Sequence, residues 1–144
     1  QGLIRIKQGQ QKKLFLGNLY SRRDWGHARD YVEAMWKMLQ QKKPDDFVIG
    51  TGKTFTIKEF VNRASKKINL NIKWVGKGIK EKAVNIKNKK IIIECRTRYF
   101  RPLEVDYLKG NASKAKKILK WAPKILIDNL IDEMIEHEIE NSND

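Results

Sequence analysis

The 144-residue sequence contains one cysteine and two histidines, and these low counts exclude several kinds of protein. Cys95 cannot form an internal disulfide, so nothing here requires an oxidising compartment, and we expect a cytoplasmic protein. His27 and His137 lie far apart in the sequence, and a single cysteine provides no pair of ligands at metal spacing. We therefore expect no metal site. Cys95 ends an apolar run, which is typical of a buried small side chain rather than of a nucleophile.

Long apolar stretches are also missing. No run approaches the roughly 18 residues that a membrane-spanning helix needs, and the first residues form neither a charged leader nor an apolar signal core. We expect no membrane partner. With 40% hydrophobic residues and four Trp, the chain can still form a core, and its length is typical of about one domain.

Acidic residues are scarce over most of the chain. The sequence has 31 Lys plus Arg against 17 Asp plus Glu, a net charge of +14. Beyond Lys124 there are seven acidic and no basic residues, so residues 1–124 carry 31 basic against 10 acidic groups, or +21. Such a charge attracts nucleic acid, anionic membranes or phosphorylated small ligands, but it is also typical of a solvated, lysine-rich surface.

Apolar residues recur with strand and helix periods in alternation, which predicts an α/β fold. Strands are predicted at 14–16, 47–49, 72–75 and 91–94, and helices at 28–39, 57–68, 113–119 and after Pro123. Thr56 and Glu59 have the spacing of a capping box at a helix start. The Met and Trp residues of the 28–39 helix are expected in the core. The lysine-rich stretch at about 76–90 shows no sustained period, which predicts an exposed loop.

The segment Gly50-Thr51-Gly52-Lys53-Thr54 contains the Gly-Lys-Thr of a phosphate-binding loop. Its spacing fails, because the position that needs an additional glycine is Phe47. Phe55 occupies the third glycine position of a dinucleotide-binding fingerprint, so that motif fails as well. We interpret the segment as a tight turn.

Two arginine segments follow predicted strands, and they are the strongest candidates for a ligand site. These are Arg22-Arg23-Asp24-Trp25 and Arg98-Tyr99-Phe100-Arg101-Pro102. A guanidinium group can hold two phosphate oxygens at once, and ligand sites of α/β folds gather at strand ends. Pairing of Arg23 and Arg101 with Asp24 and Glu104 is an equally good interpretation.

Three blocks of the sequence resemble one enzyme family. Residues 16–36 with 46–52, then 98–106, then 113–123 are similar, in this order, to the carboxyl-terminal half of GDP-mannose 4,6-dehydratases, which are extended short-chain dehydrogenases. The Arg-Asp-aromatic turn occurs widely in that superfamily. The continuation Gly-His-Ala and the block Arg-Tyr-Phe-Arg-Pro-x-Glu-Val-Asp are much more specific, and they are similar to the GDP-mannose enzymes in particular. The resemblance covers nearly the whole chain.

The resemblance implies an NADP-dependent lyase that converts GDP-mannose to GDP-4-keto-6-deoxy-mannose on the route to GDP-fucose, and a homo-oligomer, dimer or tetramer, as the complete enzyme. The family's amino-terminal Rossmann part carries the Gly-rich cofactor loop and the catalytic Tyr-x-x-x-Lys pair, and neither occurs in this sequence. We therefore expect residues 1–144 to be an α/β carboxyl-terminal, substrate-binding portion without catalytic residues. NADP would bind mainly to the missing part, and the chain alone would be inactive.

The resemblance also implies which residues bind the substrate. Arg23 and Arg101 would hold the diphosphate, Glu104 would accept from the ribose hydroxyls, and the turn from Leu16 to Asn18 would border the base. Two alternatives stay open, a related UDP- or dTDP-sugar epimerase or dehydratase and a basic nucleic-acid-binding domain. The second lacks any recognised binding motif, so we expect no nucleic-acid partner.

Overall fold

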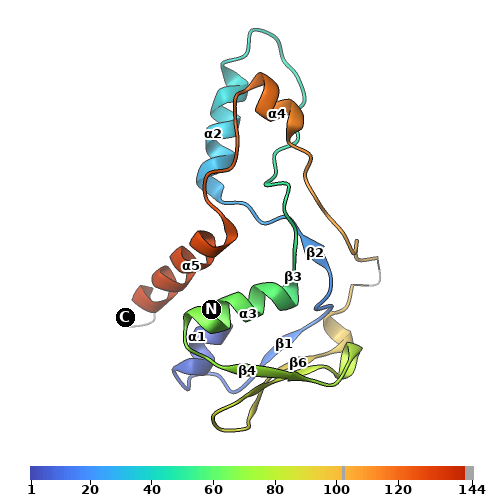
Figure 1. Cartoon of the computed structure of the whole chain (residues 1–144), viewed down its shortest axis with the longest axis vertical. Helices are drawn as coiled ribbons and strands as arrows, with labels where there is room; N and C mark the ends of the chain where they lie inside the picture. Colours follow the sequence, from blue (N-terminus) through green and yellow to red (C-terminus); the bar gives the residue numbers. More distant parts are fainter. Residues whose placement is uncertain (102, 142–144) are drawn as a thin grey trace. The chain divides into compact units, whose positions relative to one another are not determined.

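The computed structural model describes residues 1–101 and 103–141 and divides into two compact units, although the length predicts about one domain (Figure 1). Unit 1 comprises residues 1–21, 56–106 and those from 131 onward, and unit 2 comprises residues 22–55 and 107–130. Pro102 of the second arginine segment lies outside the described residues. No helix in the described part of the chain combines the length and the apolar character needed to cross a bilayer.

Unit 1 contains a four-stranded sheet in the order β1-β6-β5-β4. Its strands are β1 (Leu14–Leu16), β4 (Ile72–Val75), β5 (Lys82–Asn85) and β6 (Ile91–Cys95). The β1–β6 pair is parallel and places Leu16 beside Cys95, whereas the β4–β5 and β5–β6 pairs are antiparallel. The carboxyl ends of β1 and β6 therefore meet at one edge of this sheet.

The prediction of a loop at about 76–90 is wrong. This stretch contains a short 3-10 helix, η1 (Gly78–Lys80), and then β5, which lies between β4 and β6. Ala83 is completely buried in β5, and Glu81 just before the strand is buried as well. The strand has four residues, and its pairing with β6 shifts register between Ala83 and Val84. A strand so short and interrupted, in a lysine-rich stretch, shows no clear alternation of apolar and polar residues in the sequence.

Two helices of unit 1 supply apolar side chains to its core. They are α1 (Gly2–Lys7) and α3 (Ile57–Lys67). The capping box predicted at the start of α3 is confirmed, because Thr56 accepts from the Glu59 amide and Glu59 accepts from the Thr56 amide. The core joins helix and strand residues: Ile4, Val61, Ile68, Leu70, Ala83, Ile92 and Ile93.

Unit 2 is built around α2 (Ala28–Leu39) and α4 (Ser113–Ile118), and α5 (Ile127–Asn141) begins within it. A core of Ala34, Ala115, Leu119 and Trp121 joins α2 to α4 and the segment after it. The indole N–H of Trp121 donates to the Asp30 carbonyl at 2.7 Å. The Asp30 carboxylate in turn accepts from the Lys124 and Ile125 amides, both at 2.9 Å. A two-stranded sheet pairs β2 (Arg22–Arg23) with β3 (Phe55–Thr56).

Two predictions for unit 2 are wrong. Residues 47–49 form no strand, although their apolar run predicts one. The helix at 28–39 forms as predicted, but Met35 and Trp36 are exposed rather than in the core. Met38 of the same helix packs against the core of unit 2 as predicted, and Phe47 and Ile49 pack against it although they belong to no strand.

Candidate functional site

One candidate site lies in unit 1, where the parallel strands β1 and β6 end. The Leu16 carbonyl accepts from the Arg96 amide at 2.9 Å, which extends the pairing one residue beyond β6. Gly17 then passes so close to the segment after β6 that a Cβ atom at this position would lie 2.1 Å from the Tyr99 carbonyl oxygen. Only glycine allows this approach. The predicted turn from Leu16 to Asn18 therefore lies against the second arginine segment.

Asn18 links the same two chain segments through its side chain. Its amide nitrogen donates to the Asp106 carboxylate at 3.5 Å, and its side-chain oxygen accepts from the Tyr20 amide at 2.9 Å. The second bond holds Asn18 in a local turn. Asn18 is therefore fixed on both sides, and it lies next to the block that contains Arg101 and Glu104.

Arg101 and Glu104 follow a short 3-10 helix, η2 (Thr97–Tyr99), after β6. The Glu104 amide donates to the Arg101 carbonyl at 3.2 Å, so the two residues share one turn. Arg101 is exposed and Glu104 is partly exposed. Of the five predicted substrate residues, Leu16, Asn18, Arg101 and Glu104 thus belong to two neighbouring segments of unit 1.

A buried carboxylate, which no sequence pattern indicates, supports this site in unit 1. Glu81 accepts from the Tyr20 hydroxyl at 2.7 Å and from the Lys58 ammonium at 2.5 Å. The hydrogen bond that the Lys58 ammonium donates to Glu81 raises the pKa of Lys58. Because Tyr20 follows the Asn18 turn, Glu81 attaches that turn to the start of α3 and to the sheet. The residue escaped prediction because it lies in the stretch that was expected to be a loop.

A separate candidate site lies in unit 2, around Arg23 in β2. Arg23 lines a hollow of about 300 Å³ together with Tyr31, Leu108 and Lys109, among others. One of its guanidinium nitrogens donates to the Arg22 carbonyl at 2.9 Å. Arg22 donates to the Thr54 hydroxyl at 3.1 Å and to the Thr54 carbonyl at 2.8 Å. Burial raises the pKa of Tyr31, with a further contribution from the Asp24 charge.

Asp24 organises the chain around this hollow. Its carboxylate accepts from the amides of Thr51 and Gly52 at 2.9 Å and of Gly110 at 3.0 Å, and also from the Thr51 hydroxyl. Gly50 and Gly110 cross so closely that a Cβ at Gly50 would lie 2.9 Å from the Gly110 Cα. The amides that a phosphate-binding loop would offer to a ligand are therefore bonded to Asp24. This agrees with the failed spacing of the Gly-Lys-Thr segment.

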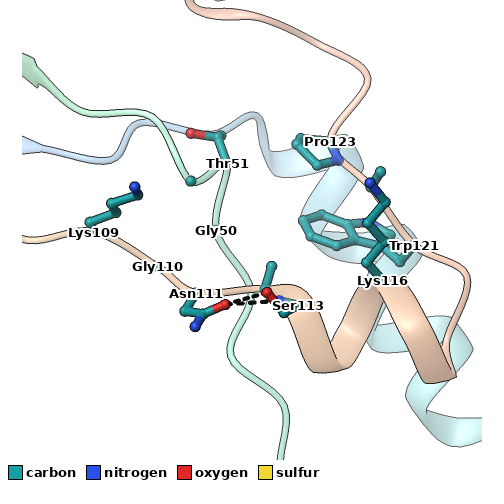
Figure 2. Close-up of a pocket in the computed structure, with 12 residues that line it drawn as sticks. Gly50, Thr51, Lys109, Gly110, Asn111, Ser113, Lys116, Trp121 and Pro123 are labelled. Atoms are coloured by element: carbon teal, nitrogen blue, oxygen red, sulfur yellow. Dashed lines mark hydrogen bonds between the residues drawn. The ribbon is translucent and has the colours of Figure 1, made fainter.

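A larger cavity of about 570 Å³ lies beside the Gly50–Gly110 crossing, and Figure 2 shows its lining. Lys109 and Lys116 contribute positive charge, and Trp121 and Pro123 contribute an apolar wall. Asn111 stabilises the start of α4, because its side-chain oxygen accepts from the Ser113 amide at 3.1 Å and the Ser113 hydroxyl at 2.6 Å. No sequence pattern predicts this cavity, since it is formed by segments far apart in the chain.

Cys95 and His27 are two further residues considered in the sequence, and both are buried. Burial raises the pKa of the Cys95 thiol, so the reactive thiolate is disfavoured. His27 is buried and caps α2 by accepting from the Arg29 amide at 3.0 Å. Within residues 1–101 and 103–141, no group of three or more His, Cys, Asp or Glu side chains could hold a metal ion.

Comparison with known proteins identifies close relatives of the sequence. The family model described as GDP-mannose 4,6 dehydratase matches residues 1–134. The GDP-mannose 4,6 dehydratase of Dictyostelium discoideum is 50% identical over 135 residues, which cover 94% of this chain and 38% of that protein. The Drosophila melanogaster protein of the same name is 46% identical over 140 residues, covering 97% and 35%. The chain thus spans little more than a third of these relatives.

Solved structures confirm the predicted fold class. The dTDP-glucose 4,6-dehydratase of Bacillus anthracis, in complex with NAD, matches with a TM-score of 0.72 and 20% identity, covering 99% of this chain and 38% of that one. RMD from Pseudomonas aeruginosa, complexed with NADPH, matches with a TM-score of 0.68 and 18% identity, covering 90% and 37%. The fold is that of a part of an extended short-chain dehydrogenase.

Proposed function

The chain belongs to the GDP-mannose 4,6-dehydratase family, and we propose that it is the carboxyl-terminal, substrate-binding part of such an enzyme. The complete enzyme would convert GDP-mannose to GDP-4-keto-6-deoxy-mannose. The names of the relatives support the substrate, and identities of 46–50% to them favour it over a UDP- or dTDP-sugar. The UDP- or dTDP-sugar alternative is supported by fold likeness only, at 20% identity or below.

The cofactor of the complete enzyme is proposed to be NADP. Support comes from the NADPH and NAD named for the two solved structures and from the family resemblance. When bound, the nicotinamide would take a hydride from the sugar and return it after water is lost. This chain contains no Tyr-x-x-x-Lys pair, so its residues would bind and orient the substrate only. We expect the 144-residue chain alone to be inactive and the complete enzyme to be a homo-oligomer.

The observation that carries the substrate-binding role is the meeting of two strand ends in unit 1. The segment after β1 contains Leu16 and Asn18, and the segment after β6 contains Arg101 and Glu104. We propose that Arg101 holds a phosphate oxygen of the substrate and that the Glu104 carboxylate accepts hydrogen bonds from the ribose hydroxyls. Leu16 and Asn18 would border the base. In unit 2, Arg23 would bind the diphosphate from its hollow.

The experiment is calorimetric titration of GDP into a complete enzyme, made by joining the amino-terminal part of the Dictyostelium relative to Gln1. A charge-assisted bond contributes about 1.5–3 kcal/mol, so Arg23→Ala and Arg101→Ala should each weaken GDP binding roughly ten- to a hundredfold. Lysine keeps the charge but loses the two-pronged geometry, so Arg101→Lys should be intermediate.

Controls separate this result from misfolding and from the alternatives. NADP affinity should be unchanged in the arginine variants, and UDP or dTDP should compete poorly with GDP. Nucleic-acid binding should show no sequence preference and should fade steeply with salt. Unchanged GDP affinity in both alanine variants would show that these arginines are local ion-pair partners.

A further inference from the structure

The cavity of about 570 Å³ beside the Gly50–Gly110 crossing, which we call the α4 cavity, has no role in the proposed function. Its lining comes from residues 50–52, 109–113 and 121–123 together with Lys116, and all of these belong to unit 2. Sites for small molecules commonly have volumes of about 300–1,000 Å³. The α4 cavity is therefore large enough for a small metabolite, and it is formed within one unit.

The charged groups of the α4 cavity are cationic. Among the described residues that line it, only Lys109 and Lys116 are charged, and Figure 2 shows them at opposite sides of the lining. Neither ammonium group has a hydrogen bond or an ion pair within residues 1–101 and 103–141. Lys114 on the same helix differs, because it pairs with Asp45 at 2.5 Å. The cavity thus presents two ammonium groups without a counter-ion, which favours an anionic ligand.

The carboxylates of unit 2 leave this positive charge uncompensated. Residues 22–55 and 107–130 contain 13 basic and 6 acidic residues, a net charge of +7. Four of the acidic side chains already accept hydrogen bonds from other groups of the unit: Asp24, Asp30, Glu33 and Asp45. An anion that enters the α4 cavity therefore meets positive charge that the chain itself has not neutralised.

The uncharged lining suits a hydroxylated ring. The Asn111 side-chain oxygen is bonded to Ser113, whereas its amide nitrogen has no acceptor in the part of the chain that the structure describes. This nitrogen can donate to a ligand hydroxyl, and the Ser113 hydroxyl oxygen can accept from one. Ala112, Ala122 and Pro123 add an apolar wall. A few polar groups beside an apolar wall are typical of a site that orients a small ligand.

We propose that the α4 cavity binds a phosphorylated sugar, and that Lys116 and Lys109 each hold a phosphate group. Lysine is a common phosphate ligand, and two lysines on opposite sides match a sugar with a phosphate at each end. The ring would lie between them, against the apolar wall and within reach of Asn111. This second ligand site goes beyond the proposed function, in which the substrate is a GDP-sugar.

A nucleotide fits the α4 cavity less well than a sugar phosphate does. Nucleobases commonly stack on aromatic faces. Trp121 is the aromatic residue of the described lining, and it is only 1% exposed, so its ring offers no free face for stacking. Its indole N–H is also bonded to the Asp30 carbonyl at 2.7 Å, so it cannot donate to a base.

The test is calorimetric titration of fructose 1,6-bisphosphate into the 144-residue chain, after circular dichroism has shown that the chain is folded. We expect saturable binding at about 0.1 M salt, where charges further apart than roughly 10 Å are screened. Glucose 6-phosphate should bind more weakly because it offers one phosphate, and glucose should not bind measurably. Inorganic phosphate should bind more weakly than glucose 6-phosphate, because it has no ring to contact Asn111 and the apolar wall.

Three variants connect this binding to the α4 cavity. Lys116→Ala should weaken fructose 1,6-bisphosphate binding about tenfold, because it removes a charge-assisted hydrogen bond. The matched control is Lys117→Ala, since Lys117 is the next residue of α4, is exposed and does not line the cavity. It should change the affinity less than about twofold. Ala122→Trp fills the cavity from an exposed position and leaves both lysines in place, so it should abolish binding.

The same titrations are repeated with the complete enzyme that joins the amino-terminal part of the Dictyostelium relative to Gln1. They replace the first series if the 144-residue chain does not stay folded. Binding with the same response to Lys116→Ala and Ala122→Trp would support the site, whether or not the enzyme binds GDP. Loss of binding in the folded complete enzyme would show that the cavity is covered there, and would overturn the proposal.

Other outcomes would also overturn the proposal. Equal losses in Lys116→Ala and Lys117→Ala, or binding that survives Ala122→Trp, would indicate attraction to the basic surface in general. Citrate or GDP binding as tightly as the bisphosphate, with the same dependence on Lys116, would contradict the assignment to a phosphorylated sugar. A loss of GDP affinity in Lys116→Ala as large as that in Arg23→Ala would assign the cavity to the substrate site.

Discussion

The carboxylate of Asp24 accepts a hydrogen bond from the backbone N–H of Gly110, which lies 86 positions further along the chain. The same carboxylate binds the amides of Thr51 and Gly52. One side chain therefore joins three separate segments of unit 2, and all three contribute to the walls of its cavities. The hollow that contains Arg23 depends on this junction.

Replacing Asp24 by Ala should destabilise unit 2. Three backbone donors would lose their charged acceptor, and each partly buried, unpaired donor costs about 1–3 kcal/mol. We expect the free energy of unfolding to fall by at least about 2 kcal/mol, with Asp24→Asn intermediate because it keeps one acceptor oxygen. Urea unfolding followed by tryptophan fluorescence measures this. A loss below about 0.5 kcal/mol would show that water replaces the carboxylate without cost.

Gly17→Ala should disrupt the edge of the sheet where β1 and β6 end. The new Cβ would lie 2.1 Å from the Tyr99 carbonyl oxygen, and backbone cannot move aside as a flexible side chain can. We expect a loss of about 2 kcal/mol or more in stability, together with weaker GDP binding by the complete enzyme. Gly78→Ala is the control. It meets no atom within 4 Å but has a φ of +55°, so it should cost only about 1 kcal/mol. Equal losses in both variants would contradict the steric argument.

The Lys58–Glu81 pair should make unit 1 sensitive to alkali. The pKa of Lys58 is raised above its ordinary value of 10.5 by its bond to Glu81, so the protonated form is favoured in the folded state. Its contribution to stability is then complete below about pH 10.5 and is lost as the pH rises through the raised value. Urea midpoints between pH 8 and 12 should fall less steeply above pH 10.5 for Lys58→Met than for the parent. Parallel curves would show that the pair contributes nothing.

Lys53→Ala tests the Gly-Lys-Thr segment. Because the Thr51 and Gly52 amides are bonded to Asp24, we expect no phosphate there, and GDP affinity of the complete enzyme should stay within about threefold. Calorimetric titration of the same preparations used for Arg23→Ala provides the comparison. A hundredfold loss on replacing Lys53 would identify the segment as part of the substrate site.

Local signals predicted much of the fold. The Thr56 and Glu59 pair placed the start of α3, and the apolar spacing placed α2 at 28–39, because these patterns act within one or two turns of a helix. The strands at 14–16 and 72–75 were also found. β5 was missed because its burial depends on β4 and β6, which lie on either side of it. No local pattern marks a strand whose core contact is mainly one alanine, Ala83.

The sequence predicts Arg23 and Arg101 as residues of the candidate sites, but it does not indicate the residues that hold the surrounding segments in place. Arg23 and Arg101 stand out because guanidinium groups follow strands, and the family resemblance assigned them a ligand. Glu81 and Asp24 act through partners that are far away in sequence, such as Tyr20 at 61 positions and Gly110 at 86. The exposed Trp36 shows the opposite error, since a helical period identifies an apolar face but not what covers it.

The order of the strands has a consequence for how the molecule folds. β4, β5 and β6 come from the continuous stretch 72–95 and pair through short connections, so their contacts are of low sequence separation. β1 pairs with β6 across 79 residues, from Leu14 to Ile93, so a long loop must close before this ladder can form. We expect pulse-labelled hydrogen exchange to protect residues 82–95 before residues 14–16. The edge that presents Leu16 and Asn18 would then be assembled late, and substitutions there should accelerate unfolding rather than slow folding.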